Sequence, residues 1–99
     1  MAFIQVIQYR TSKIDEMRAV GDEWEAEPGD NASARRVIVA QDRDNAGQYL
    51  TFAFFDSYES AMENSNSPRT QEMSQRMMSL ADGPPTFLNL DVIDDRTIG

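Results

Sequence analysis

Three segments of this sequence have the alternating side-chain pattern of β-strands, and both faces of that pattern carry large apolar residues. The segments run from Phe3 to Tyr9, from Tyr49 to Phe55 and from Thr86 to Ile93, and they are rich in aromatic and branched residues. Successive side chains of a strand point to opposite faces of its sheet. We expect the almost wholly apolar face to pack against the helices of the domain. That face would consist of Ile4, Val6, Leu50, Phe52, Phe54, Leu88, Leu90 and Val92.

The opposite face of the same strands is mixed rather than polar. It would consist of Phe3, Gln5, Ile7, Tyr9, Tyr49, Thr51, Ala53, Phe55, Phe87, Asn89, Asp91 and Ile93. A sheet face in water is normally polar, so a face of this composition needs a cover. A second copy of the chain, related by a twofold axis, is the simplest cover. The pattern therefore predicts a homodimer whose two sheets enclose a semi-polar cavity. The cavity would be lined by Gln5, Tyr49, Thr51, Asn89 and Asp91.

Two helical regions separate the strands. Ser12 and Asp15 fit a capping box, and apolar residues then recur at helical spacing as far as Trp24. The second region begins with Asp56 as its N-cap. We expect an interruption at residues 65–68, because the proline there is tolerated in a first helical turn but not in a helix interior. A further helical stretch runs from about residue 69 to residue 81, with Met73, Met77 and Leu80 as its buried stripe.

The order of these elements predicts an α+β fold of the ferredoxin-like βαββαβ type. A strand from Arg35 to Gln41 pairs with the strand from Tyr49 to Phe55 as an antiparallel hairpin, so the sheet has four antiparallel strands. A chain of 99 residues can enclose one hydrophobic core but not two. Residues 1–99 are therefore expected to form a single domain.

The composition removes several classes of function. With no Cys and no His, the chain lacks a thiolate nucleophile, a disulfide and the commonest metal ligands, so we expect neither a metal nor a cofactor. A net charge of −8 repels nucleic acid and anionic lipid. No apolar run approaches the length of a membrane span, and no signal-peptide pattern is visible. We therefore expect a cytoplasmic location, with no nucleic-acid or membrane partner.

The chain resembles the dimeric α+β barrel proteins and, within them, the antibiotic biosynthesis monooxygenase-like domains. The resemblance rests on the order of the elements, on Ser67-Pro68, and on the passage Phe54-Phe55-Asp56-Ser57-Tyr58-Glu59-Ser60-Ala61. It implies a homodimer whose sheets close into a barrel. Some members of this group oxidise aromatic polyketides without a cofactor, and others degrade haem. Many relatives have a histidine three residues before the Ser-Pro pair, where this chain has Asn64. The resemblance therefore argues against haem degradation.

The candidate site residues fall into two groups. The catalytic candidates are Asp91, Asn89 and Tyr49, and the ligand-binding candidates are Gln5, Thr51, Trp24 and Asn64. In an apolar cavity Asp91 would have a raised pKa, as a general base requires, but a pair with an arginine or a solvated position at the mouth of the barrel is its simpler role. Core packing is the simpler role for Trp24, and turn formation is the simpler role for Asn64.

Two classes of function remain open from the sequence. The first is a cofactor-independent monooxygenase-like enzyme acting on an apolar aromatic small molecule, with a polar side chain assisting proton removal before oxygen attacks. The second is a non-catalytic dimeric module that binds a small apolar ligand or has a purely structural role. The two classes are distinguished by whether the chain consumes oxygen with a hydroxylated aromatic substrate.

Overall fold

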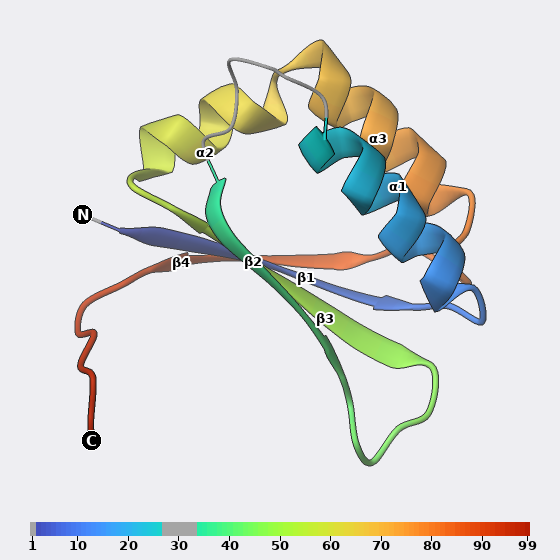
Figure 1. Ribbon diagram of the computed structural model, residues 1–99, viewed down its shortest axis with the longest axis horizontal. Coiled ribbons are helices and arrows are strands. Elements are labelled where there is room, and N and C mark those ends of the chain that lie inside the picture. The colour runs from blue at the N-terminus through green and yellow to red at the C-terminus, as the bar shows by residue number, and fades with distance from the viewer. Residues whose placement is uncertain (1, 27–33) are drawn as a thin grey trace.

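The computed structural model describes residues 2–26 and 34–99 and has two layers, a four-stranded sheet and a layer of helices that covers one face of it (Figure 1). This arrangement confirms the predicted α+β ferredoxin-like fold. The second helical region consists of two helices, as the predicted interruption at residues 65–68 requires. In chain order the elements are β1 (Phe3–Arg10), α1 (Ile14–Ala26), β2 (Ala34–Gln41), β3 (Gln48–Phe55), α2 (Tyr58–Ser65), α3 (Pro68–Met78) and β4 (Thr86–Asp91).

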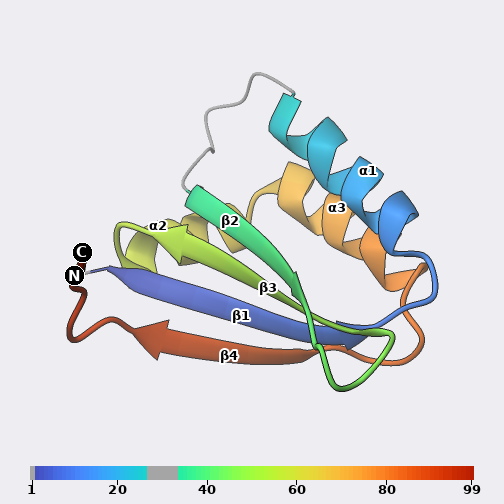
Figure 2. The same ribbon diagram turned by 60° about the horizontal axis from the view of Figure 1, so that its bottom comes forward.

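The strands lie in the order β2-β3-β1-β4, and every neighbouring pair is antiparallel (Figure 2). On central strand β1, Val6 lies opposite Phe52 of β3 and Leu88 of β4. One residue earlier, Gln5 lies opposite Ala53 and Asn89. The register therefore groups the side chains into the two faces that the alternation predicts.

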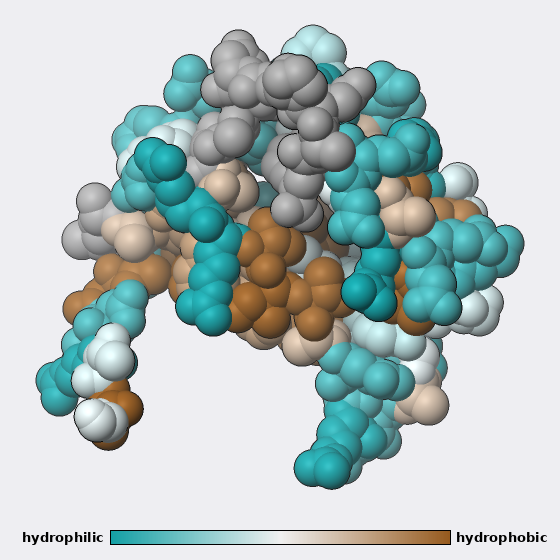
Figure 3. Space-filling view, viewed as in Figure 1, coloured by the Kyte–Doolittle hydropathy of each residue, from teal (hydrophilic) through white to brown (hydrophobic). Residues whose placement is uncertain are grey.

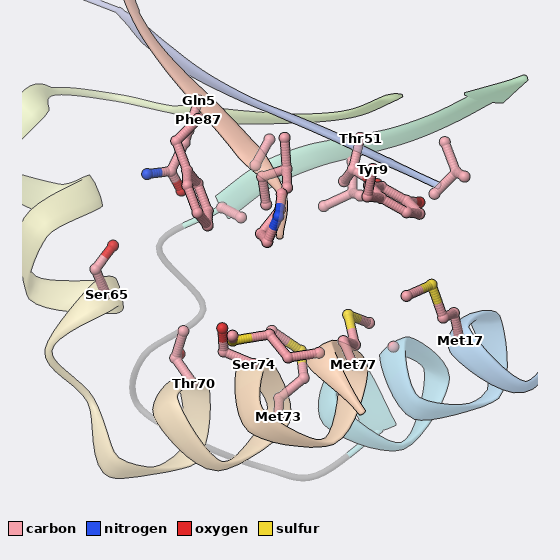
Figure 4. A pocket seen from close by; sticks show the side chains of 18 of the residues that line it. Gln5, Tyr9, Met17, Thr51, Ser65, Thr70, Met73, Ser74, Met77 and Phe87 are labelled. Carbon is pink, nitrogen blue, oxygen red and sulfur yellow. The ribbon is translucent and has the colours of Figure 1, made fainter. Parts of the chain in front are cut away.

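The helices cover the mixed face and not the wholly apolar one. Gln5, Thr51 and Phe87 line the same cavity as residues of α1 and α3, and in Figure 4 their side chains lie on the helix side of the sheet. The prediction that the wholly apolar face packs against the helices is therefore wrong. Alternation shows which residues share a face but does not show which face the helices cover. Here both faces are apolar enough to pack against helices. The inner surface of the helices includes small and polar residues such as Gly21 and Ser74, which suit a mixed sheet face.

Two serines cap the N-termini of the two helices in the second helical region. Ser57 is the N-cap of α2, and its hydroxyl accepts a hydrogen bond from the backbone N–H of Ser60 at 3.0 Å. The predicted cap, Asp56, instead forms an ion pair with Arg35 at 2.7 Å on the surface. Ser67 is the N-cap of α3, and Pro68 begins that helix, where its missing N–H costs no hydrogen bond. Asn64 lies in the last turn of α2, next to the break.

The tightly packed core lies at one end of the sheet. Phe3, Phe55 and Ala61 form its buried cluster, and Tyr58 packs edge-on against the ring of Phe3 at 5.4 Å between centroids. Ala61 and Tyr58 belong to α2, so this helix closes its end of the sheet. Met17 and Val20 are buried on α1. Between α1, α3 and the sheet the packing is looser, and a cavity remains there.

No helix of the described chain covers the other face of the sheet. We call this surface the open face; it consists of Ile4, Val6, Ile38, Leu50, Phe52, Phe54, Leu88 and Leu90. Leu88 and Leu90 are 40% and 43% exposed in the single chain. The sequence predicted that the mixed face needs a cover beyond the helices. Because the helices cover the mixed face, it is the open face that presents uncovered apolar side chains in the single chain. Within residues 2–26 and 34–99, none of the helices has the length and apolar character needed to cross a membrane.

Candidate ligand-binding and active site

A cavity of about 400 Å³ lies between the sheet and the helices α1 and α3 (Figure 4). Its volume falls within the range of pockets that hold one small organic molecule. Figure 3 shows hydrophobic side chains gathered near the centre of one face of the molecule, at the level of β2 and below the helices. The cavity lies inside one chain, and not between two sheets as predicted. Its apolar lining includes Ile7, Ile14, Met17, Val37, Val39, Ala53, Phe55, Met73, Met77, Met78 and Phe87.

The helix side of the cavity is built largely from methionine. Met73 and Met77 project from α3 and Met17 from α1, facing the sheet residues across the cavity (Figure 4). Methionine is flexible and polarisable, and its sulfur makes favourable contacts with aromatic rings. This side of the cavity can therefore adapt to a flat aromatic ligand without offering it a charge.

Asn64 is the most deeply buried polar side chain in the lining. It is only 7% exposed, and its Oδ1 accepts a hydrogen bond from the Thr70 hydroxyl at 3.4 Å. Its backbone carbonyl accepts the N–H of Ser67 at 3.1 Å, so the break between α2 and α3 holds the residue in place. Among the residues that the structure describes, no acceptor pairs with the side-chain N–H groups of Asn64. Unpaired donors are costly in an apolar site, so they are suited to binding a ligand oxygen.

Tyr9 and Thr51 form a second polar group in the lining. Their hydroxyls are hydrogen-bonded at 2.9 Å, and the ring of Tyr9 stacks on that of Tyr49 with 6.1 Å between centroids. Burial raises the pKa of the Tyr9 phenol; the hydrogen bond with Thr51 opposes this change, and the nearby Tyr49 adds to it. Tyr9 is therefore a neutral phenol at physiological pH. It can donate a hydrogen bond or accept one, but it does not act as an anionic base.

The raised pKa of Tyr9 makes the stability of the fold depend on pH at alkaline values. In the unfolded chain the phenol ionises near its ordinary pKa of 10.0, and in the folded chain it keeps its proton to a higher pH. Its contribution to stability is complete below pH 10.0 and is lost as the pH rises through the folded-state pKa. We expect urea unfolding to show a larger alkaline loss of stability in wild type than in Tyr9→Phe. Equal losses in the two proteins would contradict this assignment.

The structure brings most of the sequence-predicted site residues to the cavity or next to it. Gln5, Thr51 and Asn64 line the cavity. Asn89 contacts a lining residue, because its Oδ1 accepts a hydrogen bond from Gln5 Nε2 at 3.4 Å. Tyr49 also contacts a lining residue, because its ring stacks on the ring of Tyr9.

The other two predicted residues lie elsewhere. Asp91 is the last residue of β4, where it lies opposite Phe3; it is exposed and is not part of the lining. Trp24 lies within α1, but its side chain is outside the described part of the chain. Among the described residues, no group of three or more Asp, Glu, His or Cys side chains comes together in the way a metal site requires.

Core packing was the predicted role of the methionines of the second helical region, and Tyr9 was not among the predicted site residues. One signal was present on α3, where Thr70, Met73, Ser74 and Met77 follow each other at spacings of three and four. These residues share one helix face and all line the cavity. A helix face that alternates methionine with small hydroxyl residues fills space poorly, and this composition indicates a pocket better than a packed core.

Comparison with known proteins identifies the fold of the chain. No family profile and no curated protein matches the sequence. The structure resembles SnoaB, a cofactor-independent oxygenase from Streptomyces nogalater, solved in an asparagine-to-alanine form, with a TM-score of 0.78 and 12% identity over 95% of each chain. It also resembles Rv0793 from Mycobacterium tuberculosis, with a TM-score of 0.76 and 15% identity over 98% of this chain and 100% of that one.

A third similar structure is a candidate antibiotic biosynthesis monooxygenase from Caulobacter crescentus. It has a TM-score of 0.79 and 14% identity over 94% of this chain and 91% of that one. The chain therefore has the fold of antibiotic biosynthesis monooxygenase-like proteins, as its sequence resemblance predicts. At these identities the comparison shows the fold and leaves the activity to be argued from the site.

Proposed function

We propose that this chain is a cofactor-independent monooxygenase-like enzyme that oxidises a hydroxylated aromatic small molecule inside its cavity. The observation that carries the proposal is Asn64, which lines an apolar cavity of about 400 Å³ and whose buried side-chain N–H donors lack a partner in the described chain. The proposal is supported by the similarity of the fold to SnoaB, which is named as a cofactor-independent oxygenase.

The proposed reaction converts an activated CH₂ group of the substrate, next to an aromatic ring and a carbonyl, into a second carbonyl. Loss of a proton gives an enolate, and its carbon transfers electrons to dioxygen and forms a C–O bond. Protonation gives a hydroperoxide, which loses water to leave the new carbonyl. The sum is one CH₂ and one O₂ converted into one C=O and one water. In this reaction the Asn64 N–H groups stabilise the negative oxygen of the enolate, because preorganised donors act most strongly where charge develops in a dry site.

Two carboxylates are candidates for accepting the proton from the substrate. Asp91 is the base that the sequence analysis nominated, and it lies at the exposed end of β4. Asp22 is exposed on α1 and is part of the cavity lining. In this proposal Asn89 and Tyr49 position the side chains of Gln5 and Tyr9, which they contact.

The proposed enzyme is a homodimer in which two open faces pack together and close the sheets into a barrel. The open face carries large aliphatic and aromatic side chains, and burying them against a copy of the same surface removes them from water on both subunits. The resemblance to dimeric α+β barrel proteins supports this assembly. The dimer leaves the cavity of each chain on the outer side of the barrel, beneath the helices of that chain.

Oxygen uptake tests the proposed activity, with a panel of hydroxylated polycyclic compounds that each carry a CH₂ group between an aromatic ring and a carbonyl. We expect wild type to consume one O₂ for each carbonyl formed, with no added metal or organic cofactor. Asp22→Ala and Asp91→Ala are then compared, and the proton acceptor is the residue whose loss lowers the rate at neutral pH and whose variant is rescued at higher pH. Saturable binding without oxygen uptake across the panel would contradict the enzyme and leave the alternative function, a non-catalytic module that binds a small ligand.

A further inference from the structure

The glycine in the middle of α1 has no evident role in the fold. Gly21 lies well inside the helix Ile14–Ala26, and its φ is not positive, so its backbone does not require glycine. Among the described residues, a Cβ at this position would meet only the methyl group of Met77, at 3.6 Å, which is an ordinary contact distance. Neither the backbone nor a close approach between the helices therefore excludes alanine. Glycine is the least favourable helix residue apart from proline, so the helix loses stability by keeping it.

The side of the helix that lacks a side chain at Gly21 faces the cavity. Gly21 is part of the cavity lining, together with Met77 of α3 and its own helix neighbours Met17 and Arg18. A side chain at this position would occupy space next to the Met77 methyl group and reduce the room between α1 and α3. The absence of a side chain at Gly21 therefore leaves space on the cavity side of α1.

We propose that Gly21 is a specificity-determining residue that sets the width of the cavity and so admits flat ligands of several fused rings. This inference rests on the proposed use of the cavity as a ligand site. Met77 is the movable wall opposite Gly21, since methionine adapts its shape at little cost. The helix therefore keeps a destabilising residue where the size of the ligand requires it.

Ligands of two sizes test this role. The probes are naphthol, with two fused rings, and hydroxypyrene, with four, and each is titrated through its own fluorescence. We expect Gly21→Ala to weaken hydroxypyrene binding about tenfold or more while changing naphthol binding little, because one added methyl group in a filled pocket has an effect of this size. Gly21→Leu is expected to abolish hydroxypyrene binding and to weaken naphthol binding as well.

A matched variant separates the cavity effect from helix stability. Gly21→Ala is expected to raise Tm by about 2–8 °C, because alanine is the better helix residue. Ala19→Gly makes the opposite exchange at an exposed position of the same helix, and we expect it to lower Tm without changing the binding of either probe. The double variant Ala19→Gly/Gly21→Ala should regain the wild-type Tm and still discriminate against hydroxypyrene.

The outcomes distinguish this inference from the proposed function. If wild type bound both phenols and Gly21→Ala bound hydroxypyrene equally well, the role of Gly21 would be overturned and the ligand site would stand. Equal weakening of both probes in Gly21→Ala would also overturn it, because that pattern reports general damage. If wild type bound neither phenol, the proposed function itself would fail.

Discussion

Replacing Asn64 with alanine is expected to lower the turnover number of the proposed reaction by about 10²–10³-fold, the effect seen when a buried donor to a developing oxyanion is removed. The substitution removes both N–H donors of the side chain and leaves the backbone carbonyl, which holds the turn before α3, in place. The loss should fall mainly on kcat, because the enolate oxygen carries more negative charge than the ground-state carbonyl. Steady-state oxygen uptake with the best substrate of the panel measures it.

Two further variants sharpen the test of Asn64. Thr70→Val removes the hydroxyl that donates to Asn64 Oδ1 and keeps the Asn64 donors, so its kcat should fall less than tenfold. Asn64→Asp replaces the N–H donors with an acceptor, and it should be at least as slow as Asn64→Ala. Thermal unfolding of each variant checks that the fold is retained. A folded Asn64→Ala protein with kcat within threefold of wild type would refute the assignment of the oxyanion site.

Placing a charge on the open face is expected to separate the proposed dimer. Leu90 is 43% exposed in the single chain, so Leu90→Glu places its carboxylate in water when the chain is alone. Between two open faces the same carboxylate is buried without a partner, which costs about 3–5 kcal/mol and raises the dissociation constant by about 10²-fold or more. Sedimentation over a dilution series measures the change.

Two controls separate assembly from folding in that experiment. Leu90→Met keeps the volume and the apolar character of the side chain and should dimerise like wild type. Ala19→Glu adds the same charge on the exposed side of α1, away from the sheet, and should also remain dimeric. Circular dichroism on Leu90→Glu shows whether the separated chain keeps its fold. A wild-type protein that sediments as a single subunit at all concentrations, or a dimeric Leu90→Glu, would rule out the barrel.

The local structure was largely predictable because it depends on neighbours in the sequence. The interruption near Pro68 follows from the missing N–H of proline, and the structure has a helix start there. The two-residue period of a strand places Val6, Phe52 and Leu88 on one face, and the structure pairs them there. The N-cap of α2 was predicted one residue too early, since Asp56 and Ser57 are both good capping residues and only the three-dimensional structure pairs Asp56 with Arg35.

The site was less predictable because burial of a polar side chain is a tertiary property. Gln5, Thr51 and Asn64 were nominated from the sequence, and the structure places them in one cavity. Nothing in the local sequence distinguishes the buried Asn64 from the exposed Asn66 two residues later. The difference arises because Asn64 and Thr70 lie on the side of α2 and α3 that lines the cavity. The hydroxyl of Thr70 also donates a hydrogen bond to Asn64 Oδ1.

By itself the sequence determined the order of the strands and helices, the two sets of side chains that share each sheet face, and the need for a cover on an apolar face. Only the tertiary structure decided which face the helices occupy. That choice depends on the hand of the two crossovers, β1 to β2 through α1 and β3 to β4 through α2 and α3, which is a property of the whole chain path. The pleat of a strand is local and does not determine this hand. The chain path places the cavity inside one chain and leaves the open face without a helix in the described chain.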